Sequence, residues 1–366
     1  MSGRVNFDLS DDQEALRDGA RELLAGLAAP ERVRVVVEAG GGYDRELWAA
    51  MVEQGWPGVA LAEDHGGLGL GTVEVAVLLE EIGRHAAPAP FASTVLAADA
   101  LVAGGAVDDA ARLVSGEAIG SVAWSRHADA VRAASDNDDW TLTGRPEPVP
   151  FAPSAAVAVV VADSADGPGV YSVDLDAVGR PGAEPAMDRT RELGWLRFDA
   201  TPARRLGGID AAVALTDRGA AFASAEMLGG ASRVLDLSVE YAKDRVQFGR
   251  PIGSFQAIKH RCADMLVDVE GMRSTTYWAA WCIGAEDPEA SVAASTAKIW
   301  CGDASKRVMA SALQVHGGIG FTWEHDLHLF LKRAQLDQLS FGDASYHRER
   351  LAGFLRPRVE AGTGVI

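Results

Sequence analysis

The sequence predicts an α+β fold in which helical regions flank a central β region. Amphipathic helical patterns fill the first third of the chain and resume at about residue 207. Between them, short β-branched runs alternate with clusters of Gly, Pro, Asp and Ser, which is the pattern of strands and turns. Helix, sheet and helix in succession indicate segregated layers. We therefore expect an N-terminal helical domain over 1–120, an antiparallel β domain over 121–206 and a C-terminal helical domain over 207–366.

Length and composition limit the functions open to the chain. Its 366 residues allow two or three domains with a large core, and no uncharged run approaches the roughly eighteen residues of a membrane span. A net charge of −18 opposes binding to nucleic acid or to anionic membranes. Residues 1–13 lack the basic and apolar segments of a secretory signal, and the three cysteines lie far apart. We expect a cytosolic protein with packed thiols.

The first helix begins at a capping box. Ser10 can accept a hydrogen bond from the third following amide while Gln13 reaches back to the serine amide. Leucines and alanines at helical spacing then form one apolar stripe. Further helices are expected over 45–54 and 73–85, and the segment AEDHGGLGLG over 62–71 between them is expected to be a flexible connector.

The remaining elements follow from two periodicities. Strands are expected over 119–124, 156–162, 169–173 and 193–198. Beyond them, helices are expected over 211–242, 290–313 and 324–339. Another long amphipathic helix is marked by Phe255, Ile258, Cys262, Met265, Val269 and Met272.

Two glycine-rich segments have the composition of phosphate-binding loops. GGLGLG at 66–71 misses the GxGxxG spacing and follows no strand, so a flexible loop is the better interpretation. HGGIGF at 316–321 follows a helix and is not a dinucleotide-binding turn either. It nevertheless places Gln314 and bare backbone amides at a helix end, where a phosphate can approach closely.

Other common catalytic patterns are missing from the sequence. It contains no Glu-x-x-His pairs of a di-iron bundle and no GxSxG, and we expect no metal site. The segment YAKDRVQFGRPIGSFQAIKH over 241–260 is more informative, because it places Arg245 and Phe248 beside a Gly-Arg-Pro turn. A guanidinium and an aromatic face suit a pyrophosphate and an adenine or flavin. A helix–helix corner with a buried Phe explains the same residues equally well.

The chain resembles the flavin-dependent acyl-CoA dehydrogenases. YAKDRVQFGRPIGSFQ (241–256) and QVHGGIGFTWEHDLHLFLKRA (314–334) are the specific motifs, and FDLSDDQEALRDGARELL (7–24) and LAEDHGGLGLG (61–71) are similar to the opening helices of that family. The resemblance implies a C-terminal four-helix bundle, a dimer of dimers, and electron-transfer flavoprotein or a similar acceptor as partner. It also implies α,β-dehydrogenation, in which a glutamate removes the α-proton of an acyl-CoA and FAD accepts the β-hydride.

Carried over position by position, the resemblance implies contacts with the pyrophosphate and adenosine of an FAD bound mainly by a neighbouring subunit. The residues implied are Arg245, Gln247, Phe248, Ile252, Phe255, Gln256, Gln314, Val315, His316, Gly317 and Gly318. The flavin-ring contacts of the family are replaced here. Its Thr-Glu-Pro-Gly-Ala-Gly-Ser loop reads Ser125–Ala128, and its Trp-x-Thr reads Pro148–Pro150.

The family's catalytic glutamate is replaced as well. Its Tyr-Glu-Gly elbow reads Ser340-Phe341-Gly342, and a phenyl ring cannot accept a proton. Gly219 and Ala220 occupy the family's alternative base position and its CoA-binding arginine position. Glu226 lies two helical turns after Gly219 on the same face and is the candidate base. The other interpretations of Glu226 are a buried, hydrogen-bonded carboxylate or one at a subunit interface.

Three functions remain open. In the first, the chain completes the FAD site of a sister subunit in an α₂β₂ assembly, as the resemblance to actinobacterial members implies, and the substrate is a bulky acyl-CoA such as a steroid side chain. In the second, it is a self-sufficient homo-oligomer that oxidises an acyl-CoA or another acyl thioester with Glu226 as base. In the third, it is a non-enzymatic scaffold.

Overall fold

The computed structural model describes residues 9–137 and 139–362. The described chain divides into two compact units, each assembled from separate segments. Unit 1 lies within Met1–Pro30, Ala76–Ala87 and Ala220–Ile366, and unit 2 within Glu31–Val75 and Pro88–Gly219. The order helix, sheet, helix along the chain confirms the predicted α+β class.

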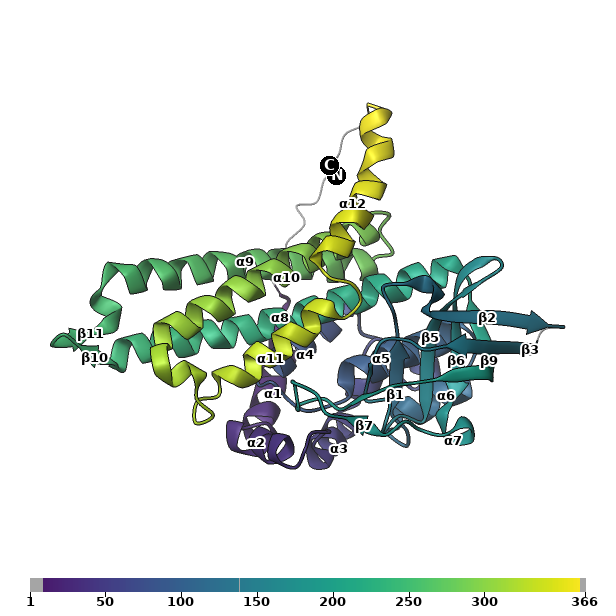
Figure 1. The fold of residues 1–366 in the computed structure, drawn as a ribbon, viewed down its shortest axis with the longest axis horizontal. Helices are drawn as coiled ribbons and strands as arrows, with labels where there is room; N and C mark the ends of the chain where they lie inside the picture. The colour runs from purple at the N-terminus through teal and green to yellow at the C-terminus, as the bar shows by residue number, and fades with distance from the viewer. Residues whose placement is uncertain (1–8, 138, 363–366) are drawn as a thin grey trace. The chain divides into compact units, whose positions relative to one another are not determined.

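Unit 1 is helical. Its long helices run alongside one another, with a small hairpin at one end, and α10 packs against α9, α11 and α12 (Figure 1). Its elements are α1 (Asp11–Leu27), most of α4 (Thr72–Arg84), most of α8 (Ile209–Asp244), β10 (Val246–Gln247), β11 (Arg250–Pro251), η4 (Ile252–Ser254), α9 (Gln256–Gly284), α10 (Ala290–His316), η5 (Gly317–Phe321), α11 (Leu327–Leu339) and α12 (Ala344–Glu360). The predicted capping box is confirmed, because Ser10 and Gln13 exchange both hydrogen bonds.

Helices α4 and α8 cross with their backbones in close contact. A Cβ atom added to Gly83 would lie 2.1 Å from the carbonyl oxygen of Glu226, and one added to Gly229 would lie 1.8 Å from that of Glu80. Only glycine fits at either position. The carboxylate of Glu80 also accepts a hydrogen bond of 2.6 Å from Arg273 of α9. The end of α4 is therefore fixed against both α8 and α9.

The apolar stripe of α9 is buried over only part of its length. It is covered from Met265 onward, whereas Ile258 and Cys262 are half-exposed. Leu266 and Val267 are 50% and 67% exposed. The first turns of α9 therefore present apolar side chains that no described residue of this chain covers.

Unit 2 combines a mixed sheet with short helices. Its helices are α2 (Pro30–Glu38), α3 (Arg45–Glu53), η1 (Trp56–Gly58), η2 (Glu63–His65), α5 (Phe91–Ala103), α6 (Val107–Val114), η3 (Ala128–Ala130) and α7 (Leu175–Val178). Its strands are β1 (Gly120–Ala123), β2 (Val131–Asp136), β3 (Asp139–Gly144), β4 (Val149–Pro150), β5 (Val157–Ser164), β6 (Gly167–Asp174), β7 (Ala183–Glu184), β8 (Leu193–Gly194) and β9 (Phe198–Gly207).

The main sheet of unit 2 has the order β1-β5-β2-β3-β9-β6, and β6 pairs again with β5 so that the pairing closes on itself. Most pairs are antiparallel, as predicted, but β1 and β2 pair with β5 in parallel. Strands β4, β8 and β7 form a second small sheet. The predicted strand over 193–198 is wrong, because residues 193–194 belong to this second sheet and β9 of the main sheet begins at residue 198.

The glycine-rich connector over 62–71 is pinned rather than flexible, which corrects the prediction. Its backbone amides donate hydrogen bonds within unit 2: Leu68 to Gly58, Gly69 to Leu61 and Leu70 to Val59. A Cβ atom on Gly67 would lie 2.1 Å from the carbonyl oxygen of Leu61. The glycines here permit close backbone packing.

Within the described part of the chain, none of the helices has both the length and the apolar character that crossing a bilayer requires. The expectation of no secretory signal rests on residues 1–13, of which the first eight lie outside the described residues. A cytosolic location stays a prediction.

Candidate functional site

The hairpin between α8 and α9 carries the first predicted cofactor-binding segment. β10 pairs with β11, and Phe248 lies at their turn with a φ of +54°, an uncommon conformation for a bulky residue. Phe248 is 92% exposed, and its ring meets that of Phe255 edge-on, with 6.1 Å between centroids. The guanidinium of Arg250 lies over the Phe255 ring at 4.1 Å. The strained turn therefore presents an aromatic face and a cation to the exterior.

The other predicted residues of this segment also lie at the surface. Arg245, Gln247 and Gln256 are exposed, and Ile252 is half-buried. The backbone amide of Ile252 donates to the carbonyl oxygen of Arg245 at 2.8 Å, which closes the base of the hairpin. The alternative interpretation of this corner, a turn that buries its Phe, is wrong for Phe248.

The second predicted segment lies at the end of α10 and separates into exposed and buried positions. Gln314, Gly317 and Gly318 are exposed, whereas the side chains of Val315 and His316 are each only 3% exposed. In this chain the latter two can reach a cofactor only through their backbones.

His316 joins the two segments. Its ring stacks on that of Tyr241 near the end of α8, with 4.7 Å between centroids, and its Nδ1–H donates to the carbonyl oxygen of Ala312 at 2.9 Å. Burial lowers the pKa of His316, so the ring is neutral at pH 7. The hairpin and the Gln314–Gly318 segment therefore lie at the same end of unit 1.

This end of unit 1 fits the pyrophosphate and adenosine of FAD. A guanidinium such as that of Arg245 binds phosphate oxygens through paired hydrogen bonds, and bare glycine amides let a phosphate approach the backbone. An exposed phenyl face such as that of Phe248 suits a purine.

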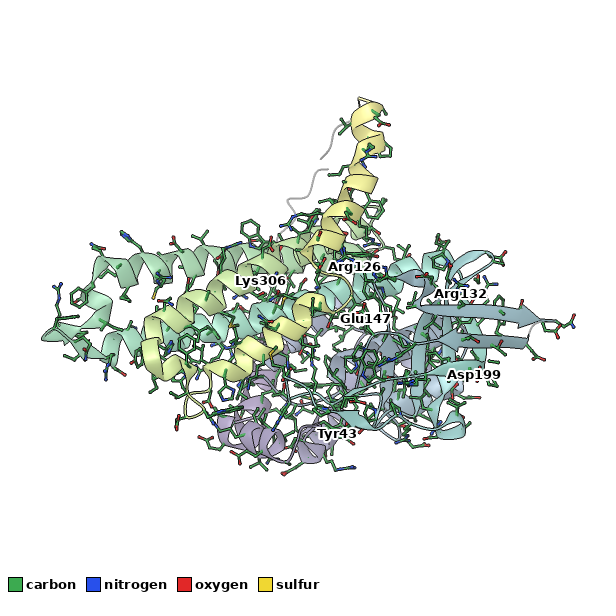
Figure 2. The ribbon with its side chains drawn as sticks, in the orientation of Figure 1. Tyr43, Arg126, Arg132, Glu147, Asp199 and Lys306 are labelled. Carbon is green, nitrogen blue, oxygen red and sulfur yellow. The ribbon has the colours of Figure 1, made fainter. Side chains whose placement is uncertain are left out.

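The positions that would contact the flavin ring do not fit it. They lie in unit 2, where the Ser125 hydroxyl accepts a hydrogen bond from the backbone amide of Glu147 at 3.0 Å. The carboxylate of Glu147 in turn accepts from the backbone amide of Arg126 at 3.3 Å, so the loop closes on itself. Figure 2 labels Arg126 and Glu147 on the ribbon. The segment aligned with the family's Trp-x-Thr forms β4, in which Val149 is 1% exposed and proline stands on either side. It offers neither a hydroxyl nor an indole.

The elbow between α11 and α12 has a fixed backbone, although its side chain carries no base. Phe341 and Gly342 have φ values of +55° and +93°. The carbonyl oxygen of Phe341 accepts a hydrogen bond from Nε2–H of His347 at 2.8 Å. A Cβ atom on Gly342 would lie 2.3 Å from the ring of Tyr346, so this position requires glycine.

A fully buried lysine holds the same elbow from α10. The Nζ atom of Lys298 donates to the carbonyl oxygens of Gln338 and Gly342, each at 2.8 Å. Burial lowers the pKa of Lys298 to about 7, against the opposing attraction of Asp337. With these two hydrogen bonds the lysine caps the last turn of α11 and fixes the turn that follows it.

His347 is held as a neutral ring. Because Nε2 donates to the elbow, Nδ1 is the acceptor and receives the hydroxyl hydrogen of Ser295 at 3.2 Å. The Ser295 oxygen accepts in turn from Arg350 at 3.3 Å. Burial lowers the pKa of His347 to about 3. Lys298 and His347 together are called the elbow clamp below.

Glu226 is enclosed in an ion pair. Its Oε1 accepts from Nη1 of Arg333 in α11 at 3.0 Å, and both side chains are 4% exposed. The other end of the guanidinium donates to the carbonyl oxygens of Ala86 and Ala87, just after α4, at 3.4 and 3.1 Å. A general base must reach the proton that it removes. This geometry favours the interpretation of Glu226 as a buried, hydrogen-bonded carboxylate that ties α8, α11 and the end of α4 together.

Sequence reasoning missed three of the groups that organise this unit: Lys298, Arg333 and His347. The one available signal was a lysine inside the apolar run AASTAKIWC, over 293–301. Elsewhere among the described residues, no three His, Cys, Asp or Glu side chains gather as a metal site would require.

Two family models match the chain: "Acyl-CoA dehydrogenase, C-terminal domain" over residues 207–355 and "Acyl-CoA dehydrogenase, N-terminal domain" over residues 10–116. The acyl-CoA dehydrogenase IpdE2 of Mycolicibacterium smegmatis is 36% identical over 327 residues, which is 89% of this chain and 93% of the relative. The acyl-CoA dehydrogenase FadE27 of Mycobacterium tuberculosis is 34% identical over 370 residues, which is 95% of this chain and 98% of the relative.

Two solved structures are similar to the chain over nearly its whole length. A variant of the Tcur3481–Tcur3483 steroid ACAD superposes with a TM-score of 0.90 and 34% identity, covering 96% of this chain and 99% of that one. The ChsE4–ChsE5 complex from Mycobacterium tuberculosis gives a TM-score of 0.90 and 31% identity with the same coverage. The chain belongs to the acyl-CoA dehydrogenase family of FAD-dependent oxidoreductases.

Proposed function

We propose that this chain is the subunit that completes the FAD site of a catalytic sister chain in an α₂β₂ acyl-CoA dehydrogenase. The sister supplies the flavin-ring pocket and the glutamate that removes the α-proton of the acyl thioester. FAD, when bound, supplies the hydride acceptor of the α,β-dehydrogenation. This chain contributes the exposed end of unit 1, with Arg245 and Phe248 on the hairpin and Gln314 at the end of α10.

The contrast between the two halves of the FAD site carries the proposal. The pyrophosphate and adenosine half is present and faces outward, with Phe248 92% exposed at a strained turn. In the flavin-ring half, Pro148–Pro150 stand in place of the family's Trp-x-Thr, and the loop at Ser125 and Arg126 is hydrogen-bonded to Glu147. A chain built in this way can contribute to a cofactor bound mainly by another chain.

The three positions considered for a base support the same assignment. The elbow carries Phe341, the alternative base position carries Gly219, and Glu226 is paired with Arg333. Activity of the chain alone with Glu226 as base would require that pair to open. The geometry therefore gives the self-sufficient enzyme no support, and a scaffold would gain nothing from the exposed hairpin.

The relatives support a proposed substrate class. One similar structure is described as a steroid ACAD, and the ChsE4–ChsE5 structure is a complex of two chains. We assign the assembly a bulky acyl-CoA such as the thioester of a steroid side chain. The exposed apolar side chains at the start of α9, Leu266 and Val267, suit a surface that a subunit covers.

Expression with and without a sister chain tests the proposal. The chain purified alone should be colourless. Co-expression with a family member that carries glutamate at the elbow should give a complex with bound FAD and acyl-CoA dehydrogenase activity. Within that complex, Arg245→Ala should weaken FAD binding by about tenfold to a hundredfold, because it removes a charged hydrogen-bond donor.

Arg356→Ala is the matched control, since Arg356 is an exposed arginine on α12 outside the hairpin. It should leave the FAD content unchanged. A yellow protein that reduces its flavin with acyl-CoA in the absence of any sister would overturn the proposal in favour of the self-sufficient enzyme. A chain that stays colourless and inert with every such sister would support the third function, a non-enzymatic scaffold.

A further inference from the structure

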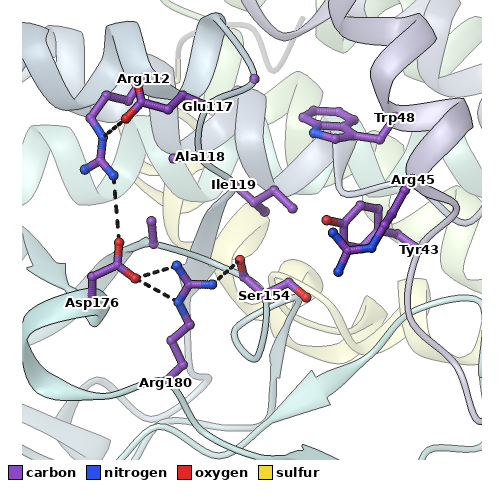
Figure 3. Close-up of a pocket in the computed structure, with 12 residues that line it drawn as sticks. Tyr43, Arg45, Trp48, Arg112, Glu117, Ala118, Ile119, Ser154, Asp176 and Arg180 are labelled. Carbon is purple, nitrogen blue, oxygen red and sulfur yellow. Dashed lines mark hydrogen bonds and ion pairs between the residues drawn. The ribbon is translucent and has the colours of Figure 1, made fainter.

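Unit 2 contains a cavity that the proposed function does not use. Its volume is about 290 Å³, near the lower end of the range for small-molecule sites. It lies among the start of α3, the segment between α6 and β1, and the end of α7 (Figure 3). The lining residues that matter here are Tyr43, Arg45, Trp48, Ile119, Ser154 and Arg180.

One wall of the cavity is already neutralised. Arg180 pairs with Asp176 and donates to the carbonyl oxygen of Ser154 at 3.3 Å. Arg112 lies between Glu117 at 3.1 Å and Asp176 at 3.8 Å. These groups satisfy one another and form a rigid polar wall.

The opposite wall carries a cation without a counter-ion. Arg45 is exposed in the first turn of α3 and forms no ion pair with any residue that the structure describes. Its guanidinium lies over the ring of Tyr43, 5.5 Å from the centroid. This leaves the N–H groups at the edge of the Arg45 guanidinium available to a ligand.

The same wall contains a buried donor without an acceptor. Trp48 is 6% exposed, and its Nε1–H finds no hydrogen-bond partner among the described side chains and backbone. In Figure 3 its ring turns the nitrogen edge toward the space between Ile119 and Tyr43. A buried N–H without an acceptor is unfavourable, so an oxygen that reaches it is bound more strongly than one in water.

The aromatic side chain of Tyr43, which also lines the cavity, follows a glycine-rich turn. Tyr43 follows three consecutive glycines, Gly40–Gly42, with φ values of +105°, +105° and +130°. Glycine populates such conformations without a steric penalty, so the chain reaches Tyr43 without backbone strain.

We propose that this cavity binds a small organic anion in which a carboxylate or phosphate group is attached to a flat aromatic body. The anionic oxygens accept hydrogen bonds from the Arg45 guanidinium and the Trp48 indole N–H. The aromatic body lies between Tyr43 and Ile119. Since the whole chain carries a charge of −18, its overall field opposes anions, and retention at this site requires the local donors.

Titration of the full-length chain with phenyl phosphate tests the proposal. Calorimetry should give a Kd on the order of 0.1–1 mM, as expected for a ligand of this size. The ¹⁵N-labelled indole N–H resonance of Trp48, assigned by its loss in Trp48→Phe, should shift on binding. Benzoate should bind in the same way. Benzyl alcohol, which lacks the charge, and inorganic phosphate, which lacks the ring, should each bind at least about tenfold more weakly.

Two arginine variants make the test specific. Arg45→Gln should weaken phenyl phosphate binding about tenfold or more. Arg132→Gln, which changes an exposed arginine on β2 away from the cavity, should have no effect. Absence of binding up to about 10 mM, or equal affinity in wild type and Arg45→Gln, would overturn the proposal. Equal affinity for inorganic phosphate would overturn the assignment of an aromatic body. None of these readouts depends on FAD or a sister chain.

Discussion

Substituting Gln for Glu226 would remove the charge that this carboxylate sets against Arg333. The two side chains meet at 3.0 Å and are 4% exposed, so water contributes little screening. Breaking a buried ion pair by changing one partner costs about 3–5 kcal/mol. Arg333 keeps its hydrogen bonds to Ala86 and Ala87, and glutamine can still accept one, so we expect a loss near the lower end, about 3 kcal/mol.

Urea unfolding followed by circular dichroism at 222 nm measures this loss. With a denaturant slope of about 3 kcal/mol per molar, the midpoint should fall by about 1 M. Glu240→Gln provides the control, because Glu240 is an exposed glutamate on the same helix. It should change stability by less than about 0.5 kcal/mol.

The double variant Glu226→Leu/Arg333→Met should recover most of the lost stability, since apolar residues of similar volume often replace a buried ion pair without net loss. A different pattern would refute the structural interpretation of Glu226. If Glu226→Gln unfolds at the same urea concentration as wild type and abolishes turnover in the assembled enzyme, the carboxylate is the base and its pairing is incidental.

Two further predictions concern the elbow clamp, and both follow from its lowered pKa values. Lys298 has a folded pKa of about 7 against 10.5 unfolded, so the unfolded chain holds more protons between these values and stability should rise from pH 7 toward 10. Lys298→Met should flatten that rise in urea titrations at stepped pH; an unchanged rise would contradict the assignment. His347 has a folded pKa of about 3 against 6.5, so stability should fall as pH drops from 6.5 toward 3, by up to roughly 5 kcal/mol. His347→Gln should reduce that loss, which thermal melts at pH values from 4 to 7 would measure. An unchanged dependence of the melting temperature on pH in the variant would contradict the assignment.

Elements with a strong local pattern could be predicted from the sequence. The capping box at Ser10 and the α8 helix, expected over 211–242 and found at Ile209–Asp244, depend on neighbouring residues alone. The β2–β3 hairpin was not predicted, because its strands expose most of their side chains and include Asp, Ser and Thr. Helix α12 was not predicted either, because only Ala344 and His347 of its residues are buried.

The organisation of the candidate site was harder to predict for a different reason. The exposed hairpin was recognisable because its motif is contiguous over 241–256. By contrast, Lys298 lies 40 and 44 residues from the carbonyl groups that it binds, and Glu226 lies 107 residues from Arg333. Such pairs have no local signature, and only the packing of α8, α10 and α11 brings them together.

The elbow and the exposed hairpin each contain a phenylalanine with positive φ, Phe341 and Phe248, and the two are held by different contacts. A left-handed conformation costs a bulky residue on the order of 1–2 kcal/mol, so surrounding contacts must hold it. At Phe341 those contacts are internal, because the clamp of Lys298 and His347 is buried in the same unit. At Phe248 they amount to a short hairpin and an exposed ring. The elbow is therefore held by buried contacts from its own unit, whereas the turn at Phe248 is held among the described residues by the β10–β11 pairing and the edge-on contact with Phe255.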